Sequence, residues 1–423
     1  MKRNYTWKSW DETTLHISNL AYEISPGTAQ PVADIRRTVH ECLDGPIAAA
    51  SLRTTVSPST RVLILADDVT RPTPQKLLIP PLIEYLTNAG VPGKNITLLV
   101  ALGSHRKMRD EELRGHYGEY VLQNVVLKNH DYDDPEQLTY MGTTDDGTPI
   151  HVNRLLREAD VTIGVSSILP HAQVGWGGGG KIVLPGTAGE DTVAHMHRIA
   201  AEQPDYPFYA GRMENPARAI IDKVAGEAGL GFILNAVIDS RHRVVQVVAG
   251  DPQEAHREGR KLSSRLYIRP IPEKSDITIV DCSPADLDYR QGLKPLTLSS
   301  HGTRDGGTII LHGDFSDGIT HSNDGLDRYG TLSLSELREM VARGTLVNGI
   351  AIGALYQHAG VKEKARVFCV SKGLTEELCG KLGFRWFSSL QEAYQTAAEL
   401  SQDGPPAAGI IHQGGEVLPR IST

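Results

Sequence analysis

The chain has 423 residues, which is long enough for two domains or three, and its 40% hydrophobic and 22% charged residues are typical of a soluble globular protein. The net charge of −8 argues against non-specific nucleic-acid binding, which needs a basic face. The absence of an apolar run of about 18 residues, and of an apolar core at the N-terminus, predicts a cytoplasmic protein with no nucleic-acid or membrane partner.

The first half of the chain repeats one pattern, in which an apolar, β-branched run ends in a polar or glycine-rich loop and a helical stretch follows. Strands are predicted at 61–68, 95–102 and 159–167. Helices are predicted at 77–90 and from Asp110 onward. This alternation favours a parallel α/β sheet.

A second unit begins near Ile268, where the sequence YIRPIPEKSD is typical of a linker. Apolar runs predict further strands at 275–284, 307–315, 365–373 and 407–421, and helices at 333–344 and 389–404. We therefore predict an α/β fold of two α/β domains with mostly parallel sheets and an active site in the interdomain cleft. The N-terminal domain covers 1–268, with the tail 410–423 as a candidate addition to it, and the C-terminal domain covers 275–409.

Polar side chains follow each of the first three predicted strands. Asp68 and Arg71 follow the first strand, His105 follows the second and His171 follows the third. Ligands of open α/β sheets bind outside the carboxyl ends of the strands, so these side chains are expected at one edge. The alternative for each histidine is a solvated surface position, because loops are polar and exposed.

The segment PHAQVGWGGGGKIVLPG, residues 170–186, contains four consecutive glycines and one lysine. Gly175–Lys181 fits the pattern G-x-x-x-x-G-K, but Ile182 stands where a nucleotide triphosphatase needs Ser or Thr for magnesium. Pro185 also prevents the long helix that such a loop uses. The glycines can instead bring backbone N–H groups close to an anion, and Lys181 is then a counter-charge or a nucleophile.

Two further pairs of polar residues lie on predicted helices. His195 and His197 on a helix point about 200° apart, so one of the two is expected to reach a site. A zinc site made of protein ligands alone needs about three or four of them, so this segment alone is weak evidence for a metal. Gln291 and Lys294 share one face of a helical turn and suit an anionic or polyhydroxylated ligand. The alternatives are a solvated helical face and an exposed polar loop.

Taken together, these segments resemble the lactate racemase family, whose members carry a nickel-pincer nucleotide. The resemblance covers nearly the whole chain in motif order and spacing, including the sixteen positions from Lys181 to His197. Its carriers are DDVTRPTP (67–74), GSHR (103–106), the segment 170–186, HMH (195–197) and QGLK (291–294).

The resemblance implies a racemase or epimerase that inverts C2 of a 2-hydroxy acid. Hydride would move reversibly to the cofactor, Ni(II) pyridinium-3,5-bisthiocarboxylic acid mononucleotide, through a 2-keto acid. Lys181 would anchor this cofactor covalently, and the glycines would let the chain lie close against it. The cofactor binds nickel through two sulfurs and a ring carbon, and His197 would complete the metal's plane. Enzymes that synthesise the cofactor are implied partners.

The same resemblance assigns the remaining residues. His105 and His171 would be the paired acid–base residues, one for each enantiomer, and an imidazole pKa of ~6.5 suits both roles. Asp68, Thr70 and Arg71 match the cofactor and substrate loop. The candidates for binding the carboxylate of the substrate are Arg71, Gln291 and Lys294.

The chain departs from the lactate enzymes at Arg290, where a tyrosine is expected, and in its GSHR and WGGGG sequences. These departures suit a larger or more polar substrate, such as malate, a longer hydroxy acid or a sugar acid like gluconate. Two other functions stay open. One is a zinc-dependent hydrolase that uses His105, His171 and His197, and the other is a non-catalytic protein that binds the pincer nucleotide.

Overall fold

The computed structural model describes residues 5–8, 14–212, 214–319, 325–401 and 404–422. The expectation of no signal segment rests partly on residues outside these ranges, as do residues 402 and 403 of the predicted helix 389–404. In the part of the chain that is described, no helix has the length and apolar character needed to cross a membrane.

The first unit is built on a six-stranded sheet with the order β13-β12-β9-β4-β5-β6, and only the β12–β13 pair is antiparallel. All six residues of its central strand β4 are buried, because a strand covered on both faces reads as a continuous apolar run. The strands are β4 (Val62–Asp67), β5 (Ile96–Ala101), β6 (Val126–Asn129), β9 (Val161–Ser167), β12 (Phe232–Ile238) and β13 (Val244–Gly250).

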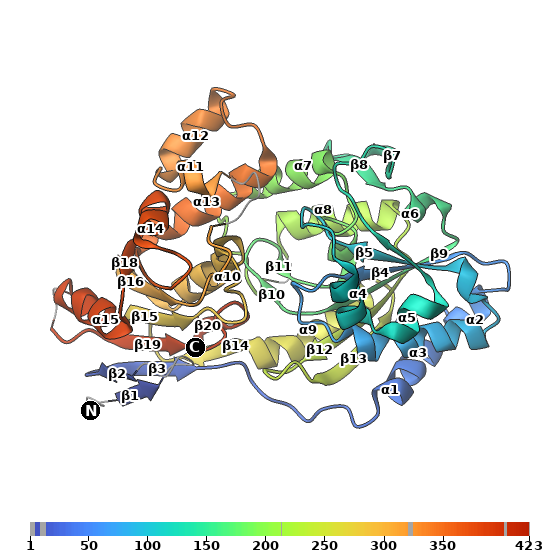
Figure 1. The fold of residues 1–423 in the computed structure, drawn as a ribbon, viewed down its shortest axis with the longest axis horizontal. Coiled ribbons are helices and arrows are strands. Elements are labelled where there is room, and N and C mark those ends of the chain that lie inside the picture. The colour runs from blue at the N-terminus through green and yellow to red at the C-terminus, as the bar shows by residue number, and fades with distance from the viewer. Residues whose placement is uncertain (1–4, 9–13, 213, 320–324, 402–403, 423) are drawn as a thin grey trace.

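Helices cover both faces of this sheet (Figure 1). Alternate residues of β4 point to opposite faces of the sheet. Ile64 belongs to the core shared with the first group of helices named next, and Leu63 belongs to the core shared with α7 and α8 of the second group. The first group is α1 (Ile35–Asp44), α3 (Gln75–Asn88), α4 (Asp110–Tyr117) and α5 (Glu119–Asn124). The second group is α7 (Glu190–Ala201), α8 (Pro216–Glu227) and α9 (Glu254–Tyr267).

The second unit is a six-stranded, all-parallel sheet with the order β18-β17-β16-β15-β19-β3. Its strands are β3 (Leu20–Ile24), β15 (Ser275–Asp281), β16 (Thr303–His312), β17 (Arg366–Val370), β18 (Arg385–Phe387) and β19 (Ala408–Ile411). Its helices are α10 (Tyr289–Ser300), α11 (Leu326–Tyr329), α12 (Leu334–Ala342), α13 (Gly349–Lys364), α14 (Glu376–Leu382) and α15 (Leu390–Glu399). The predicted α/β class with mostly parallel sheets is confirmed.

Short elements connect these layers. Three antiparallel pairs are β1 (Tyr5–Lys8) with β2 (Thr14–Ile17), β7 (Leu138–Thr143) with β8 (Pro149–Asn153), and β10 (Pro170–His171) with β11 (Gly175–Trp176). A parallel pair joins β14 (Ile268–Ile271) to β20 (Leu418–Ile421). Four short helices complete the chain: α2 (Leu52–Thr55), α6 (Leu155–Glu158), and the 3-10 turns η1 (Gly93–Asn95) and η2 (Gly179–Ile182).

Strand pairing departs from the predicted division of the chain at both ends. Strand β3 was assigned to the N-terminal domain, but it pairs with β19 in the second sheet. The predicted linker contains strand β14, which pairs with β20, so the tail adds no strand to the first sheet. These long-range pairings have no local signal, because a strand's own sequence does not specify its partner. The domain bounds themselves stay a prediction.

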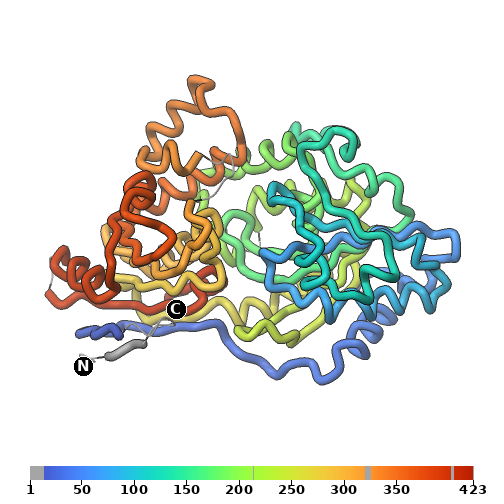
Figure 2. The backbone as a smooth tube through the Cα atoms, in the orientation of Figure 1, coloured from blue at the N-terminus to red at the C-terminus, as the bar shows by residue number. Residues whose placement is uncertain are grey.

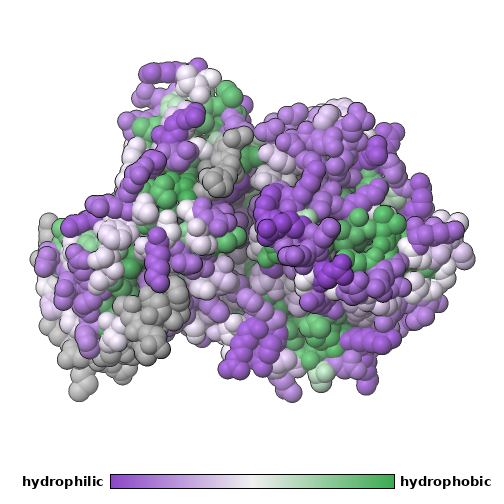
Figure 3. Space-filling view, in the orientation of Figure 1, coloured by the Kyte–Doolittle hydropathy of each residue, from purple (hydrophilic) through white to green (hydrophobic). Residues whose placement is uncertain are grey.

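The two units lie side by side, and α7 of the first packs closely against α13 of the second (Figure 1). A β-carbon at Gly349 of α13 would lie 1.9 Å from the carbonyl oxygen of Ala194, so glycine permits this close approach. On the other side the chain crosses between the units after β3, along the lower edge of the backbone trace (Figure 2). The space-filling view shows two lobes with polar side chains over most of this face (Figure 3).

Candidate active site

A cavity of about 510 Å³ lies between the units, within the size range of small-molecule sites. The first unit lines it with the loops after β4, β5 and β9 and with η2 and α7, while the second unit contributes α10 and α13. Every residue proposed for the site lines this one cavity: Asp68, Thr70, Arg71, His105, His171, Lys181, His197, Gln291 and Lys294. The residues selected from the sequence therefore converge at one cavity between the units, where the site is predicted.

His105 and Asp68 form a buried pair at the ends of β5 and β4. His105 Nδ1 lies 2.8 Å from Asp68 Oδ2, and the Thr70 hydroxyl donates to Asp68 Oδ1 at 2.6 Å. Burial would raise the pKa of Asp68, but His105, Arg71 and Thr70 outweigh it and hold the pKa well below its ordinary value. Burial lowers the pKa of His105, and Asp68 offsets this only in part. The pair is therefore a carboxylate and a neutral imidazole whose Nδ1–H donates to Asp68, with Nε2 left to accept a proton.

His171 lies on the short strand β10, directly after the loop that follows β9. Its Nδ1 is buried and has no hydrogen-bond partner in the described part of the chain. Burial lowers the pKa of His171 well below its ordinary value, and the charges of Lys181 and Lys294 lower it further. His171 is thus a second neutral imidazole in the cavity.

Lys181 lies on the turn η2, where the glycine run ends. Burial lowers the pKa of its ammonium to about 7, and the guanidinium groups of Arg71 and Arg218 contribute to the shift. An amine with this pKa is about half unprotonated at neutral pH, so it can act as a nucleophile.

The glycines of this loop are needed mainly for contact with the protein itself. Gly179 has a φ of 58°, and a β-carbon there would lie 2.5 Å from Arg218 Nη2. A β-carbon at Gly180 would lie 3.0 Å from the side chain of Ala225. Gly177 and Gly178 line the cavity, while Gly179 and Gly180 pack against the protein. That the run lies close against a nucleotide stays a prediction.

Three residues that the sequence analysis missed hold this loop in place. Arg218 Nη1 donates to the carbonyl of Gly178 at 3.2 Å, and His256 Nε2 lies 2.7 Å from the carbonyl of Gly177. Asn235 Oδ1 accepts from the backbone N–H of Gly179 at 2.9 Å. These residues come from α8, α9 and β12 and carry no motif, so only the fold reveals them.

His197 reaches the cavity from α7, and its neighbour His195 is not among the lining residues, in line with one histidine of the pair facing the site. His197 Nδ1 is buried with no hydrogen-bond partner among the described residues. A β-carbon at Gly353 of α13 would lie 3.0 Å from this nitrogen, so the glycine leaves room for the imidazole against the second unit. Burial lowers the pKa of His197 to about 3, aided by Arg290 and Lys181. A neutral imidazole is the form that binds metals.

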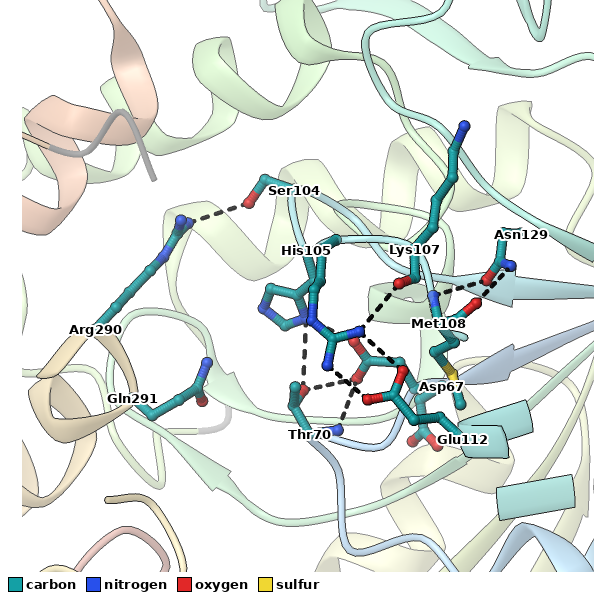
Figure 4. A network of polar contacts seen from close by, with 12 residues as sticks. Asp67, Thr70, Ser104, His105, Lys107, Met108, Glu112, Asn129, Arg290 and Gln291 are labelled. Carbon is teal, nitrogen blue, oxygen red and sulfur yellow. Dashed lines mark hydrogen bonds and ion pairs between the residues drawn. The ribbon is translucent and has the colours of Figure 1, made fainter. Parts of the chain in front are cut away.

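The second unit contributes one face of helix α10. The Lys294 ammonium donates to Gln291 Oε1 at 2.7 Å, which confirms that the two share a face. Burial lowers the pKa of Lys294 well below its ordinary value, and the charges of Arg71 and Lys181 add to the shift. From the first turn of α10, Arg290 Nη2 donates to Ser104 Oγ of the first unit at 3.1 Å (Figure 4). This concentration of cationic groups suits an anionic ligand.

Asp67 is a further buried carboxyl group of the cavity that the sequence analysis did not select. Thr73 Oγ1 and Gln75 Nε2 each donate to it at 2.6 Å. Burial raises the pKa of Asp67 to about 7 against these two hydrogen bonds. Its signal in the sequence was the pair of adjacent acidic residues at the end of a buried strand.

Two α/β units therefore enclose one cavity lined by imidazoles and cationic side chains, as in α/β enzymes with a site between two units. Two solved structures share this fold. One is lactate racemase apoprotein from Thermoanaerobacterium thermosaccharolyticum, with a TM-score of 0.87 and 24% sequence identity, covering 99% of this chain and 100% of that chain. The other is a Thermotoga maritima protein, with a TM-score of 0.73 and 21% identity, covering 93% of this chain and 99% of that chain.

Sequence comparison identifies the family. The family model of the lactate racemase N-terminal domain matches residues 8–206. Lactate racemase of T. thermosaccharolyticum is 30% identical over 292 residues, or 69% of this chain and 68% of the relative. Lactate racemase of Lactiplantibacillus plantarum is 29% identical over 299 residues, with the same coverage of 69% and 68%. The chain belongs to the lactate racemase family, as its motifs predicted.

Proposed function

We propose that this protein is a racemase or epimerase that inverts C2 of a 2-hydroxy acid. Its membership of the lactate racemase family supports an isomerase of this kind. The observation that carries the proposal is the convergence in one cavity of two neutral imidazoles, a lysine with a lowered pKa and a third imidazole whose Nδ1 has no partner among the described residues.

The residues of the cavity fit a nickel-pincer nucleotide. Lys181, with its pKa of about 7, would form the covalent bond to the cofactor, and the neutral His197 would bind the nickel. The surrounding cationic groups suit the negative charges of a nucleotide. When bound, the cofactor supplies an acceptor for the α-hydrogen as hydride, which avoids the dianionic carbanion that loss of a proton would give.

The protein's own part in the reaction is to bind the acid and to move the hydroxyl proton. His105 is held by Asp68 with Nε2 as the acceptor, and the Asp68 carboxylate stabilises the imidazolium that forms. His171 is proposed to do the same for the opposite enantiomer. Arg71, Gln291 and Lys294 are proposed to hold the substrate carboxylate, for which a bidentate guanidinium is well suited.

A zinc-dependent hydrolase that uses His105, His171 and His197 has less support. The described residues contain no group of three or more His, Cys, Asp or Glu side chains that could hold a metal ion together. A pincer ligand brings three donor atoms of its own, so one histidine is sufficient. The remaining alternative, a protein that holds the nucleotide without turnover, is separated by measuring turnover.

The decisive experiment uses protein produced together with the cofactor-synthesis enzymes. Intact mass and peptide mapping should find a cofactor adduct on Lys181. The loaded protein should then exchange stereochemistry at C2 of at least one acid in a series from lactate to gluconate, followed by chiral chromatography. An unmodified Lys181 would contradict the cofactor assignment, and an adduct without isomerisation of any acid would leave a binding protein.

A further inference from the structure

Arg290 reaches across the cavity, and most of its hydrogen-bond donors have no partner in the part of the chain that the structure describes. The Asp288 side chain caps α10 by accepting from the N–H of Gln291 at 2.8 Å, and this fixes the turn that carries Arg290. Arg290 lines the cavity and extends to Ser104 of the first unit (Figure 4). Within the described ranges this is the one hydrogen bond of a guanidinium that has five donors, and no carboxylate forms an ion pair with it.

In the described part of the chain, Arg290 shares with Arg71 the lack of an ion pair, whereas two arginines behind the lining of the cavity are paired. Arg106, on the same loop as Ser104, forms an ion pair with Glu112 at 2.6 Å. Arg218, behind the glycine loop, forms one with Asp222 at 2.9 Å. A guanidinium that faces a cavity and has no carboxylate partner among the described residues is suited to bind a ligand's carboxylate in a bidentate manner.

Arg290 and the carboxylate ligands proposed above make different contacts. Arg290 donates to Ser104 in the loop after β5, whereas Lys294, one helical turn further along α10, donates to Gln291. Arg290 is therefore not needed for the first carboxylate and is left to bind another anionic group.

We propose that Arg290, together with Ser104, binds a second anionic group of the substrate, so that the preferred substrate is a 2-hydroxy dicarboxylic acid of the malate class. The inference rests on the proposed function and narrows its substrate. A neutral polyhydroxylated tail is less well matched, because it needs acceptors as well as donors, and this position supplies a permanent cation and one hydroxyl. A substrate with one carboxylate leaves Arg290 without an anionic partner.

The test compares malate, lactate and gluconate with cofactor-loaded enzyme. We expect kcat/KM for malate to exceed that for lactate and for gluconate by at least about 10-fold. Arg290→Met should lower kcat/KM for malate about 30- to 100-fold, the loss expected for a hydrogen-bonded charge pair, and change that for lactate less than about 3-fold. Arg290→Lys, which keeps the charge but not the bidentate geometry, should fall between wild type and Arg290→Met.

Arg106→Met is the matched control. It removes a guanidinium of the same loop as Ser104, but this guanidinium pairs with Glu112 and does not line the cavity. It should leave the malate-to-lactate ratio unchanged. As a readout that does not depend on malate turnover, succinate should inhibit lactate racemisation competitively and bind about 10-fold more weakly to Arg290→Met.

Four outcomes overturn the inference. The first is a wild-type kcat/KM for malate that does not exceed those for lactate and gluconate, and the second is an equal loss of kcat/KM for malate and lactate in Arg290→Met. The third is loss of the Lys181 adduct in Arg290→Met, and the fourth is the same change of the malate-to-lactate ratio in the control Arg106→Met. In each case an enzyme that still isomerises lactate leaves the proposed function intact. Loaded wild-type enzyme that isomerises no acid overturns both proposals.

Discussion

The two units supply the cavity in different ways. The first unit delivers Asp68, His105 and His171 from loops at the ends of adjacent parallel strands, where the topology itself brings them together. The second unit delivers Gln291 and Lys294 from one face of a single helix, whose position depends on how the units pack. The comparison teaches that groups proposed for chemistry are fixed by one sheet, while groups proposed for recognition, apart from Arg71 and Ser104, come from across the cleft.

This contrast has a test in enzyme kinetics. Substitutions in the first unit should affect the adduct or kcat, and those on α10 should affect KM and the choice of substrate. Five experiments examine the contrast, from the largest expected effect to the smallest.

Lys181→Ala should abolish both the adduct and all isomerisation, because no other amine is proposed to anchor the cofactor. Intact mass and chiral chromatography measure the two losses. Lys223→Ala is the control, since this lysine lies on α8 and pairs with the exposed Asp145. A loaded and active Lys181→Ala protein would contradict the assignment.

His105→Ala and His171→Ala should each keep the adduct and lower kcat about 10²- to 10⁴-fold, the usual contribution of a positioned acid–base group. Rates measured from each enantiomer should show which histidine serves which direction. Normal racemisation by either variant would remove that histidine from the proposed pair.

Gln291→Ala should raise KM about 10-fold and change kcat less than about 3-fold, since it removes a neutral hydrogen-bond donor to the charged carboxylate of the substrate. Initial rates over a range of substrate concentration separate the two constants. A large loss in kcat with unchanged KM would show that α10 takes part in chemistry, and it would break the contrast between the units.

Gly353→Ala examines a place where the second unit lies close to the group proposed for the metal. Its β-carbon would lie 3.0 Å from His197 Nδ1 and 3.3 Å from the Tyr206 hydroxyl, so the imidazole must shift. We expect less nickel per adduct, measured by elemental analysis. Gly360→Ala on the same helix is the control, because its nearest atom lies at 3.4 Å. Alanine there should keep the nickel and stabilise the helix by about 0.5–1 kcal/mol.

Lys181→Met should change the pH dependence of stability in protein without cofactor. The pKa of Lys181 falls from 10.5 in the unfolded chain to about 7 in the folded chain. Below pH 7 the folded state carries the full cost of the buried charge, and this cost declines as pH rises toward 10.5. The denaturation midpoint of the variant should therefore exceed that of wild type most below pH 7, and the difference between the two should narrow up to pH 10. A gap that widens with pH would be inconsistent with a lowered pKa.

Local patterns explain what the sequence could predict. Alternating apolar runs placed β4, β5 and β9, and helical periodicity identified one face for Gln291 and Lys294 and a single cavity-facing histidine on α7. The partners of these residues were not predictable, because they come from distant parts of the chain. Arg218 and His256 hold the glycine loop from other helices, and Ser104 meets Arg290 only when the two units pack.

Strand β3 has a practical consequence for dividing this protein. It is the edge strand of the second sheet, yet the next helix, α1, belongs to the first unit, so the second unit is not one continuous stretch of chain. A fragment cut near residue 268 would carry away a strand that the remaining half needs to cover β19. Split-protein designs and isolated-domain expression should therefore keep residues 20–24 attached to the C-terminal half.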